Sequence, residues 1–201
     1  MNLLVVYAHP SPTSFQASLL EALTVRLREA GHTLRVLDLY AEAFDPVLRL
    51  DGWRAHREHH AFAGGLETHI QALSEADGLI FLYPTWWYGL PAILKGWIDR
   101  VWQPGVAFEL ETGVFQTRYL RRIKRFVVIT TYGSPRYFIE WVVGDPVRRQ
   151  LARGLALQFG RGVRTAWLPI YDVDRRSPGD LAGARDRVVT RAVKSLLSHR
   201  P

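Results

Sequence analysis

Three short segments of the chain carry side chains that could bind a phosphorylated ligand with a flat ring. The first segment, residues 9–16, supplies the hydroxyls of Ser11, Thr13 and Ser14 just before an amphipathic stretch. Hydroxyls at a helix start, where backbone N–H groups lack intrahelical partners, suit phosphate. The segment has no glycine, so it is neither a P-loop nor the glycine-rich dinucleotide motif. Alternatively, Ser14 is only a helix N-cap.

The second segment, residues 83–91, holds three adjacent aromatic residues between two prolines. Aromatic side chains and backbone N–H groups together suit a flat, partly apolar ring with polar edges, such as an isoalloxazine. A packed loop or a subunit contact is the alternative, because Trp and Tyr favour interfaces. The candidate ligand-binding residues here are Pro84, Thr85, Trp86, Trp87 and Tyr88.

The third segment, residues 130–134, combines hydroxyl groups with a glycine. Gly133 would let the backbone approach a ligand closely, and Thr131, Tyr132 and Ser134 could meet the far edge of a ring. By itself the segment could be an ordinary turn. The three segments together are a stronger signal than any one of them.

The elements that must position these segments alternate between strand and helix. Short apolar runs predict strands at residues 3–8, 33–39, 78–83, 125–131 and 164–170. Helical spacing predicts helices at residues 15–27, 66–76, 91–101, 145–159 and 181–197, with Gly31 ending the first and a looser segment over 40–65.

Five β-α units predict an α/β/α three-layer sandwich with a parallel sheet in the order 2-1-3-4-5. Ligands of such sheets bind beyond the carboxyl ends of the strands. The three segments follow the first, third and fourth strands, so we expect them to meet there and bind a flavin.

Composition narrows the class of protein further. With 201 residues we expect a single domain spanning 1–201. The absence of cysteine excludes disulfides and thiol nucleophiles and fits the cytoplasm. No apolar run is long enough for a membrane span, and the start of the chain does not read as a signal peptide. The net charge of +7 favours anionic partners or is simply a solvated basic surface.

The sequence resembles the flavodoxin-like NAD(P)H:quinone oxidoreductases over nearly its whole length. The resemblance rests on Tyr7-Ala8-His9-Pro10, on residues 13–16, on residues 84–101 and on residues 129–134. Residues 90–101 are the most specific part. The resemblance implies a flavodoxin-like fold and two-electron, ping-pong hydride transfer from NAD(P)H through a flavin to quinones or similar acceptors.

The resemblance also assigns roles by position. It implies that the flavin phosphate is held by His9, Thr13, Ser14, Phe15 and Gln16. It implies that residues 84–88 lie along the isoalloxazine, with Trp86 or Trp87 lining the substrate pocket, and that residues 131–134 lie at its pyrimidine end. Tyr137 corresponds to a catalytic tyrosine near the flavin carbonyl.

Two positions depart from the family pattern. Val143 stands before Gly144-Asp145, where some members have a histidine that relays charge to the flavin. Tyr137, water or the backbone must then stabilise the reduced cofactor. Thr85 precedes Trp86 where many members have glutamine, which could reshape the pocket.

Other properties remain open at this point. Residues 13–16 resemble those of FAD-binding members, whereas the short chain resembles some FMN-binding ones, so the resemblance favours FAD slightly and leaves FMN possible. The choice of NADH or NADPH is undetermined. Family members are typically homodimers. The main alternative function is a flavin-binding ancillary subunit of a potassium-efflux system. A one-electron carrier is disfavoured because flavodoxins are usually acidic, and no nucleic-acid-binding motif is present.

One histidine cluster lies outside the three segments. His56, His59 and His60 have i, i+3, i+4 spacing and could share a helical face. No carboxylate partner is obvious, so an exposed or dimer-contact helix is favoured over a metal site. We predict no metal.

Overall fold

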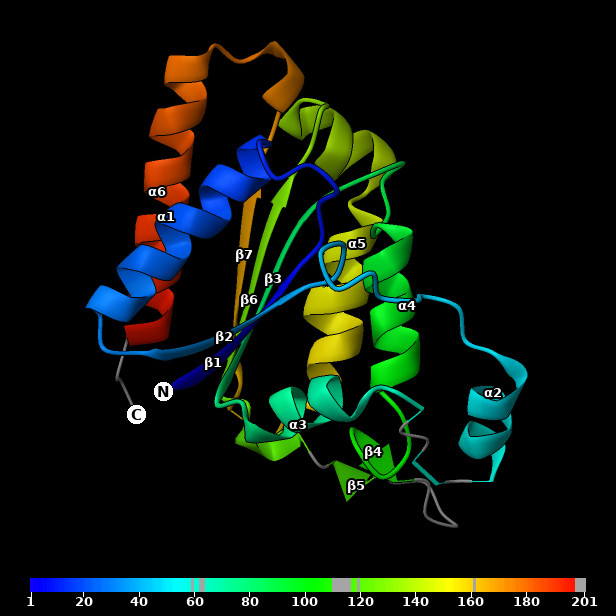
Figure 1. The fold of residues 1–201 in the computed structure, drawn as a ribbon. Helices are drawn as coiled ribbons and strands as arrows, with labels where there is room; N and C mark the ends of the chain where they lie inside the picture. Colours follow the sequence, from blue (N-terminus) through cyan, green and yellow to red (C-terminus); the bar gives the residue numbers. More distant parts are fainter. Residues whose placement is uncertain (59, 62–63, 110–116, 119, 161, 198–201) are drawn as a thin grey trace.

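The computed structural model describes residues 1–58, 60–61, 64–109, 117–118, 120–160 and 162–197. Its centre is a five-stranded parallel sheet in the order β2-β1-β3-β6-β7 (Figure 1), which confirms the predicted order. The strands of this sheet are β1 (Asn2–Tyr7), β2 (Thr33–Asp38), β3 (Gly78–Pro84), β6 (Arg125–Thr131) and β7 (Arg164–Ile170). The predicted boundaries are correct within about one residue.

Helices cover both faces of the sheet (Figure 1). One face carries α1 (Phe15–Glu29) and α6 (Pro178–Leu197), and the other carries α3 (Glu67–Glu75), α4 (Ala92–Val101) and the helical segment that contains α5 (Pro146–Arg148). The central strands β1 and β3 are buried on both faces, which explains why their sequences are continuous apolar runs rather than alternating ones. The three-layer prediction is confirmed.

The two long helices on the first face have clear start and stop signals. Ser14 caps α1, and Gly31 follows its end with φ +79°, a backbone conformation that favours glycine. α6 begins with Pro178 after Ser177, whose hydroxyl accepts the Asp180 N–H at 3.1 Å. These signals fix the start of both helices and the end of α1, and the buried apolar side chains of each helix pack it against the sheet.

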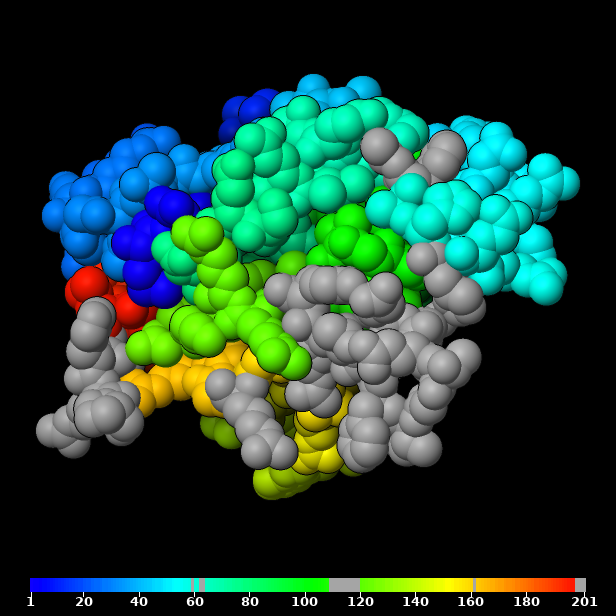
Figure 2. Space-filling model, turned by 90° about the horizontal axis from the view of Figure 1, so that it is seen from below, coloured from blue at the N-terminus to red at the C-terminus, as the bar shows by residue number. Residues whose placement is uncertain are grey.

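Two predicted segments differ from the structure. The helix predicted over 145–159 is broken into α5, the π-helix η3 (Arg149–Gly154) and the 3-10 helix η4 (Leu155–Gln158). Each piece spans at most six residues, which is too short for the apolar pattern to separate one helix type from another. The looser segment over 40–65 contains α2 (Leu50–Arg57), which lies at one edge of the molecule in Figure 1 and Figure 2.

Several short elements were not predicted. They are the two-residue strands β4 (Phe108–Glu109) and β5 (Thr117–Arg118), the 3-10 helices η1 (Leu120–Arg122) and η5 (Val173–Arg175), and the π-helix η2 (Phe138–Val143). None of the helices in the described part of the chain is long and apolar enough to cross a membrane.

The predicted helical face of three histidines does not form. α2 ends at Arg57, so it contains His56 but not His60, and His59 lies outside the described residues. His60 instead lies 3.8 Å from the Glu58 carboxylate. Within the described residues no group of histidines and carboxylates has metal-binding geometry.

The parallel register brings the carboxyl ends of the strands to one edge. Pro84 at the end of β3 pairs with Thr131 at the end of β6, which pairs with Ile170 at the end of β7. The chain segments that follow these strands therefore start side by side. This edge is where the sequence predicts the ligand.

Candidate functional site

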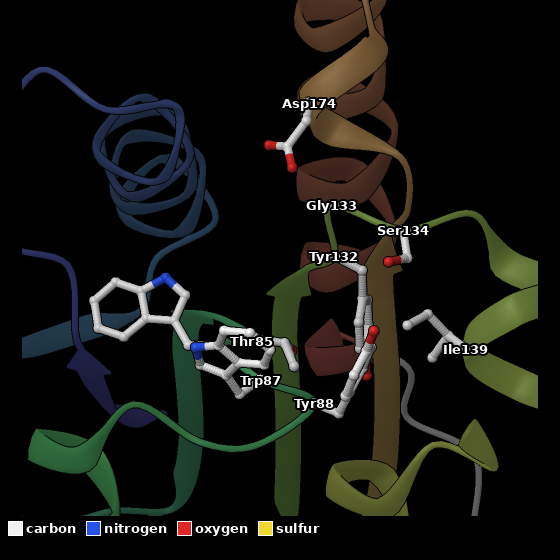
Figure 3. Close-up of a pocket in the computed structure, with 9 residues that line it drawn as sticks. Thr85, Trp87, Tyr88, Tyr132, Gly133, Ser134, Ile139 and Asp174 are labelled. Atoms are coloured by element: carbon white, nitrogen blue, oxygen red, sulfur yellow. The ribbon is translucent and has the colours of Figure 1, made fainter.

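A hollow of about 410 Å³ lies at the carboxyl edge of the sheet (Figure 3). Its size is in the range of small-molecule sites, roughly 300–1,000 Å³. It is lined by residues that follow β3, β6 and β7, namely Thr85, Trp86, Trp87, Tyr88, Tyr132, Gly133, Ser134, Ile139 and Asp174. The fold therefore brings the second and third predicted segments together in one hollow.

The wall after β3 is a tight turn in a strained conformation. Trp86 and Gly89 exchange two backbone hydrogen bonds of 3.2 and 2.9 Å, and Trp87 and Tyr88 between them have φ of +49° and +59°. Two residues with positive φ between such a pair match a type I′ turn, which normally carries Asn-Gly. Bulky side chains in this conformation cost of order 1–2 kcal/mol each.

Strain and exposure coincide at this turn. Trp87 is 95% exposed, so in the free protein no burial of its side chain offsets the energetic cost of its backbone conformation. Strained backbone that persists without a packing gain is typical of functional sites. The turn thus presents aromatic surface at the hollow for a ligand or a partner.

The opposite wall is formed by Gly133, Ser134 and Asp174. A Cβ at position 133 would overlap the Asp174 carboxylate, so the close approach of these two residues needs glycine. Asp174 comes from η5, directly after β7 (Figure 3). The hollow therefore has an aromatic side and a polar side, as a ring with polar edges requires.

Tyr132 is held in the wall by a buried carboxylate. Its hydroxyl donates to Asp145 Oδ1 at 2.8 Å, and its ring stacks on Tyr171 at 5.2 Å. Burial, followed by the hydrogen bond and charge of Asp145, raises the pKa of Tyr132 far above its ordinary value. The Tyr132 hydroxyl is consequently a fixed hydrogen-bond donor to Asp145 at any physiological pH.

Polar contacts tie the three predicted segments to one another. Gln16 Nε2 donates to Thr131 Oγ1 at 3.0 Å, which joins the start of α1 to the end of β6. The hydroxyls of Thr85 and Thr130 are 2.8 Å apart, and the ring of His9 lies 6.4 Å from that of Trp86. The first segment therefore borders the hollow without lining it.

The segment before α1 has the geometry of a helix start. Ser14 Oγ accepts the Ala17 N–H at 3.1 Å, so the N-cap interpretation is correct for this side chain. The N–H groups of Phe15 and Gln16 in the first turn have no intrahelical acceptor. Ser11 Oγ and Thr13 Oγ1 are 3.2 Å apart beside them. These donors and hydroxyls could hold an anion.

Some of the predicted residues do not line the hollow. Pro84 and Thr131 are buried at the strand ends, and Gln16 is 2% exposed with its amide turned toward Thr131. Tyr137, at the start of η2, is 61% exposed and is not part of the lining. The role of Tyr137 stays a prediction.

Two lining residues were missed from the sequence. Asp174 follows the fifth strand at the same edge, so the rule that directed attention to the other three loops could have found it. Ile139 belongs to η2, a helix that the sequence pattern did not predict. Asp145 was noted only as part of a Gly-Asp pair, and its bond to Tyr132 depends on the tertiary fold.

Comparisons with known proteins agree with this architecture. A family model described as "Flavodoxin-like fold" matches residues 1–163. The ribosyldihydronicotinamide dehydrogenase [quinone] of Mus musculus is 35% identical over 161 residues, which cover 72% of this chain and 69% of the relative.

Solved structures match nearly the whole chain. The NAD(P)H:quinone oxidoreductase from Methanothermobacter marburgensis has a TM-score of 0.78 and 29% identity, covering 100% of this chain and 98% of that chain. An FMN-dependent NADH-azoreductase from Bacillus anthracis str. Ames Ancestor, in complex with FMN, shares the fold at a TM-score of 0.76, with 16% identity and 98% and 100% coverage. The chain belongs to the flavodoxin-like family of NAD(P)H dehydrogenases (quinone).

Proposed function

We propose that this protein is a flavin-dependent NAD(P)H oxidoreductase that passes two electrons to quinones or similar acceptors. The observation that carries the proposal is the strained turn at Trp87 and Tyr88, which presents aromatic surface at the carboxyl edge of the sheet. Membership of the quinone dehydrogenase family supports the same chemistry.

The residues of the site fit a flavin. A planar ring needs a flat apolar contact and hydrogen-bond partners at its edge, and the hollow has aromatic residues on one side and Gly133-Ser134 on the other. A phosphate-bearing tail needs donors, and the start of α1 has free first-turn N–H groups beside two hydroxyls. We propose that Thr85–Tyr88 and Tyr132–Ser134 hold the ring, and that His9 and Thr13–Gln16 hold the phosphate.

A bound flavin supplies the hydride and electron transfer, and the protein supplies binding, orientation and polarity. In our proposal the backbone N–H groups of residues 133–134 offset negative charge at the ring edge. The exposed Trp87 lines the open hollow, and we propose that nicotinamide and acceptor exchange beside it. Val143 has no titratable group, so Tyr137 is our candidate for the residue whose hydroxyl stabilises negative charge at the ring.

The choice between FAD and FMN rests on a direct measurement. The preference for FAD drawn from residues 13–16 gains no support from the comparisons. The one FMN complex reported above resembles this chain in fold. Both cofactors share the ring, ribityl chain and first phosphate, so the proposed contacts apply to each, and mass spectrometry of the flavin released from the holoprotein identifies the cofactor.

We further propose a single-domain homodimer that works in the cytoplasm. The family model and α6, which packs on β7 and α1, support one domain over the whole chain. Support for a dimer comes from the exposed aromatic side chains Trp86 and Trp87, which line the open hollow. Light scattering of the purified protein measures the assembly state.

Anaerobic reduction tests the function. The holoprotein is titrated with NADPH and NADH while its visible flavin absorbance is recorded, and a quinone is then added. We expect bleaching by at least one nucleotide and recovery on addition of the quinone. A flavin that binds but is reduced by neither nucleotide refutes the oxidoreductase proposal. The comparisons reported above give no support to the potassium-efflux alternative, and we propose no second function.

A further inference from the structure

A second hollow lies on the other side of η2 from the hollow at the carboxyl edge of the sheet, which we call the active-site hollow. It measures about 460 Å³ and is lined by Glu140, Trp141, Gly144, Asp145, Arg148, Arg149, Ala152 and Arg153, a set that we term the arginine groove. Ile139 lines the active-site hollow, whereas the next two residues line the arginine groove. A single helical segment, which Figure 1 shows beside the carboxyl edge of the sheet, therefore separates the two.

The arginine groove carries more positive than negative charge, with three arginines and two carboxylates in its lining. Arg148, Arg149 and Arg153 are exposed, and in the described part of the chain none of them forms an ion pair with a carboxylate. Arg149 donates to the Gly144 carbonyl, which holds its guanidinium against the groove. Three such guanidinium groups around one hollow suit a phosphate, which arginine can bind with two parallel hydrogen bonds.

The two carboxylates of the groove are already engaged by other groups. Glu140 accepts from Arg136 Nε at 2.9 Å, and this bond holds the pKa of Glu140 below its ordinary value. Asp145 is 5% exposed and accepts from the Tyr132 hydroxyl and the Arg148 N–H. The charge of Arg148 also contributes to the lowered pKa of Glu140, but among the described residues neither carboxylate forms an ion pair with the three arginines.

The groove also has an aromatic surface. Trp141 is 83% exposed although it is one of the largest apolar side chains, and it lies beside the arginines. An exposed indole can stack on a nucleobase, at a gain of roughly 1–3 kcal/mol per base. Guanidinium groups next to an exposed indole favour a phosphorylated nucleotide over a simple anion.

We propose that the arginine groove binds the adenosine 2′-phosphate of NADPH and makes this protein prefer NADPH to NADH. The proposal rests on the proposed function, because that function places the nicotinamide in the adjacent hollow. A helix is about 10–12 Å across, a span that an extended dinucleotide can cross. Arg148 and Arg153 bind the 2′-phosphate, and Trp141 stacks on the adenine.

Direct binding of 2′,5′-ADP tests the proposal without the reaction. Equilibrium dialysis of the purified holoprotein compares 2′,5′-ADP with 5′-AMP and inorganic phosphate. We expect 2′,5′-ADP to bind at least ~10-fold more tightly than either, as one extra charge-assisted contact implies. Equal affinity for 5′-AMP refutes the 2′-phosphate site, and equal affinity for phosphate shows a simple anion site and refutes the nucleotide assignment.

A pair of double variants locates the site. Arg148→Ala with Arg153→Ala should weaken 2′,5′-ADP binding at least ~10-fold. The control is Arg187→Ala with Arg191→Ala, which removes the same charge from exposed positions on α6, on the opposite face of the sheet. This control should leave binding unchanged. Equal losses in both variants would mean that only net charge matters, and the proposal would be wrong.

Steady-state kinetics separates this proposal from the proposed function. The groove variant should lower kcat/KM for NADPH at least ~10-fold and leave kcat/KM for NADH unchanged. Unchanged preference for NADPH in the groove variant contradicts the proposal. If neither nucleotide reduces the flavin but 2′,5′-ADP binding still depends on the groove arginines, the proposed function fails while the nucleotide site stands.

Discussion

The rings of Tyr132 and Tyr171 are stacked, yet their hydroxyls donate hydrogen bonds to carboxylates in different environments. Tyr132 donates to Asp145, which is buried and has a left-handed backbone with φ +43°. Tyr171 donates at 3.1 Å to Glu140, which also accepts from Arg136. The same chemical change at the two tyrosines should therefore have unequal effects on stability.

We expect Tyr132→Phe to lower the free energy of unfolding by about 1–3 kcal/mol, because it leaves a buried carboxylate with one fewer donor. Tyr171→Phe is the matched control and should cost less than ~1 kcal/mol, since Glu140 keeps its arginine. Urea unfolding of each purified variant measures the difference. Equal losses would show that the hydrogen bond to Asp145 contributes no more to the free energy of unfolding than the one to Glu140.

Gly133 allows Asp174 to approach closely in the polar wall of the hollow. A side chain at position 133 would disturb this contact. In Gly133→Ala the new methyl group displaces the Asp174 carboxylate, an exposed side chain that can move at little cost to folding. We expect the melting temperature of the apoprotein to change little and the flavin Kd to rise at least ~10-fold, equal to about 1.4 kcal/mol.

The control for this variant is Gly154→Ala, where a Cβ would meet only the Arg149 carbonyl at 3.9 Å. Fluorescence titration of the apoproteins with FMN and FAD measures each Kd. If Gly133→Ala binds flavin as tightly as Gly154→Ala does, the polar wall does not contact the cofactor.

Among the structural elements, the turn after β3 has a strained backbone that lowers the stability of the free protein, and we propose that it serves to bind flavin. Trp87→Asn keeps the turn but places a residue that tolerates positive φ, so we expect the apoprotein to gain about 0.5–1 kcal/mol while flavin binding weakens. Trp87→Ala removes the same ring and keeps most of the backbone cost, so it should weaken flavin binding without the gain. Thermal unfolding and flavin titration of both variants provide the comparison. A loss of stability in Trp87→Asn would contradict the strain that we infer at this turn.

The contact between α3 and α4 depends on a neutral histidine. His69 is 8% exposed, its Nδ1 accepts from Trp97 Nε1 at 3.2 Å, and its Nε2 lies 3.4 Å from the Glu42 carboxylate. Burial, followed by the charges of Arg35 and Arg100, lowers the pKa of His69 below its ordinary value of 6.5. The folded state therefore binds a proton less readily than the unfolded state does.

It follows that His69 contributes stability above pH 6.5 and that this contribution is lost as the pH falls through the lowered pKa. We expect His69→Gln to be less stable than the parent protein at pH 7.5 and to lose less stability between pH 7.5 and pH 5.5. Urea unfolding at the two pH values measures this. His32 and His56 also have pKa values lowered by burial, so the variant should reduce the pH dependence without abolishing it. An unchanged pH dependence would contradict a neutral His69.

For the whole molecule, bound flavin should act as a stabilising ligand. The proposed site joins residues from the carboxyl ends of β1, β3, β6 and β7, so binding should resist separation of these strands. At a flavin concentration 100 times Kd we expect a gain of about 2.7 kcal/mol in unfolding free energy. The melting temperature measured over a series of flavin concentrations checks this, with riboflavin as a control that lacks the phosphate. A melting temperature independent of flavin would contradict a site built across the sheet.

The layered fold and the edge at which the site lies can both be predicted from the amino-acid sequence. Strands such as β1 and β3 are buried on both faces and must be continuously apolar, whereas helices covering a sheet need a periodic apolar face. These are properties of neighbouring residues, so they can be read along the chain. The strand order and the carboxyl edge then follow from chain connectivity.

Which side chains share the site depends on contacts between distant parts of the chain. The left-handed conformation of Trp87 contradicts its local preference, and Asp174 meets Gly133 only because β6 and β7 are neighbours. The arginine groove likewise depends on the broken helix after β6, whose turns have no distinct sequence pattern. Local sequence encodes local conformational preference, but contacts between distant residues form only when the sheet brings them together.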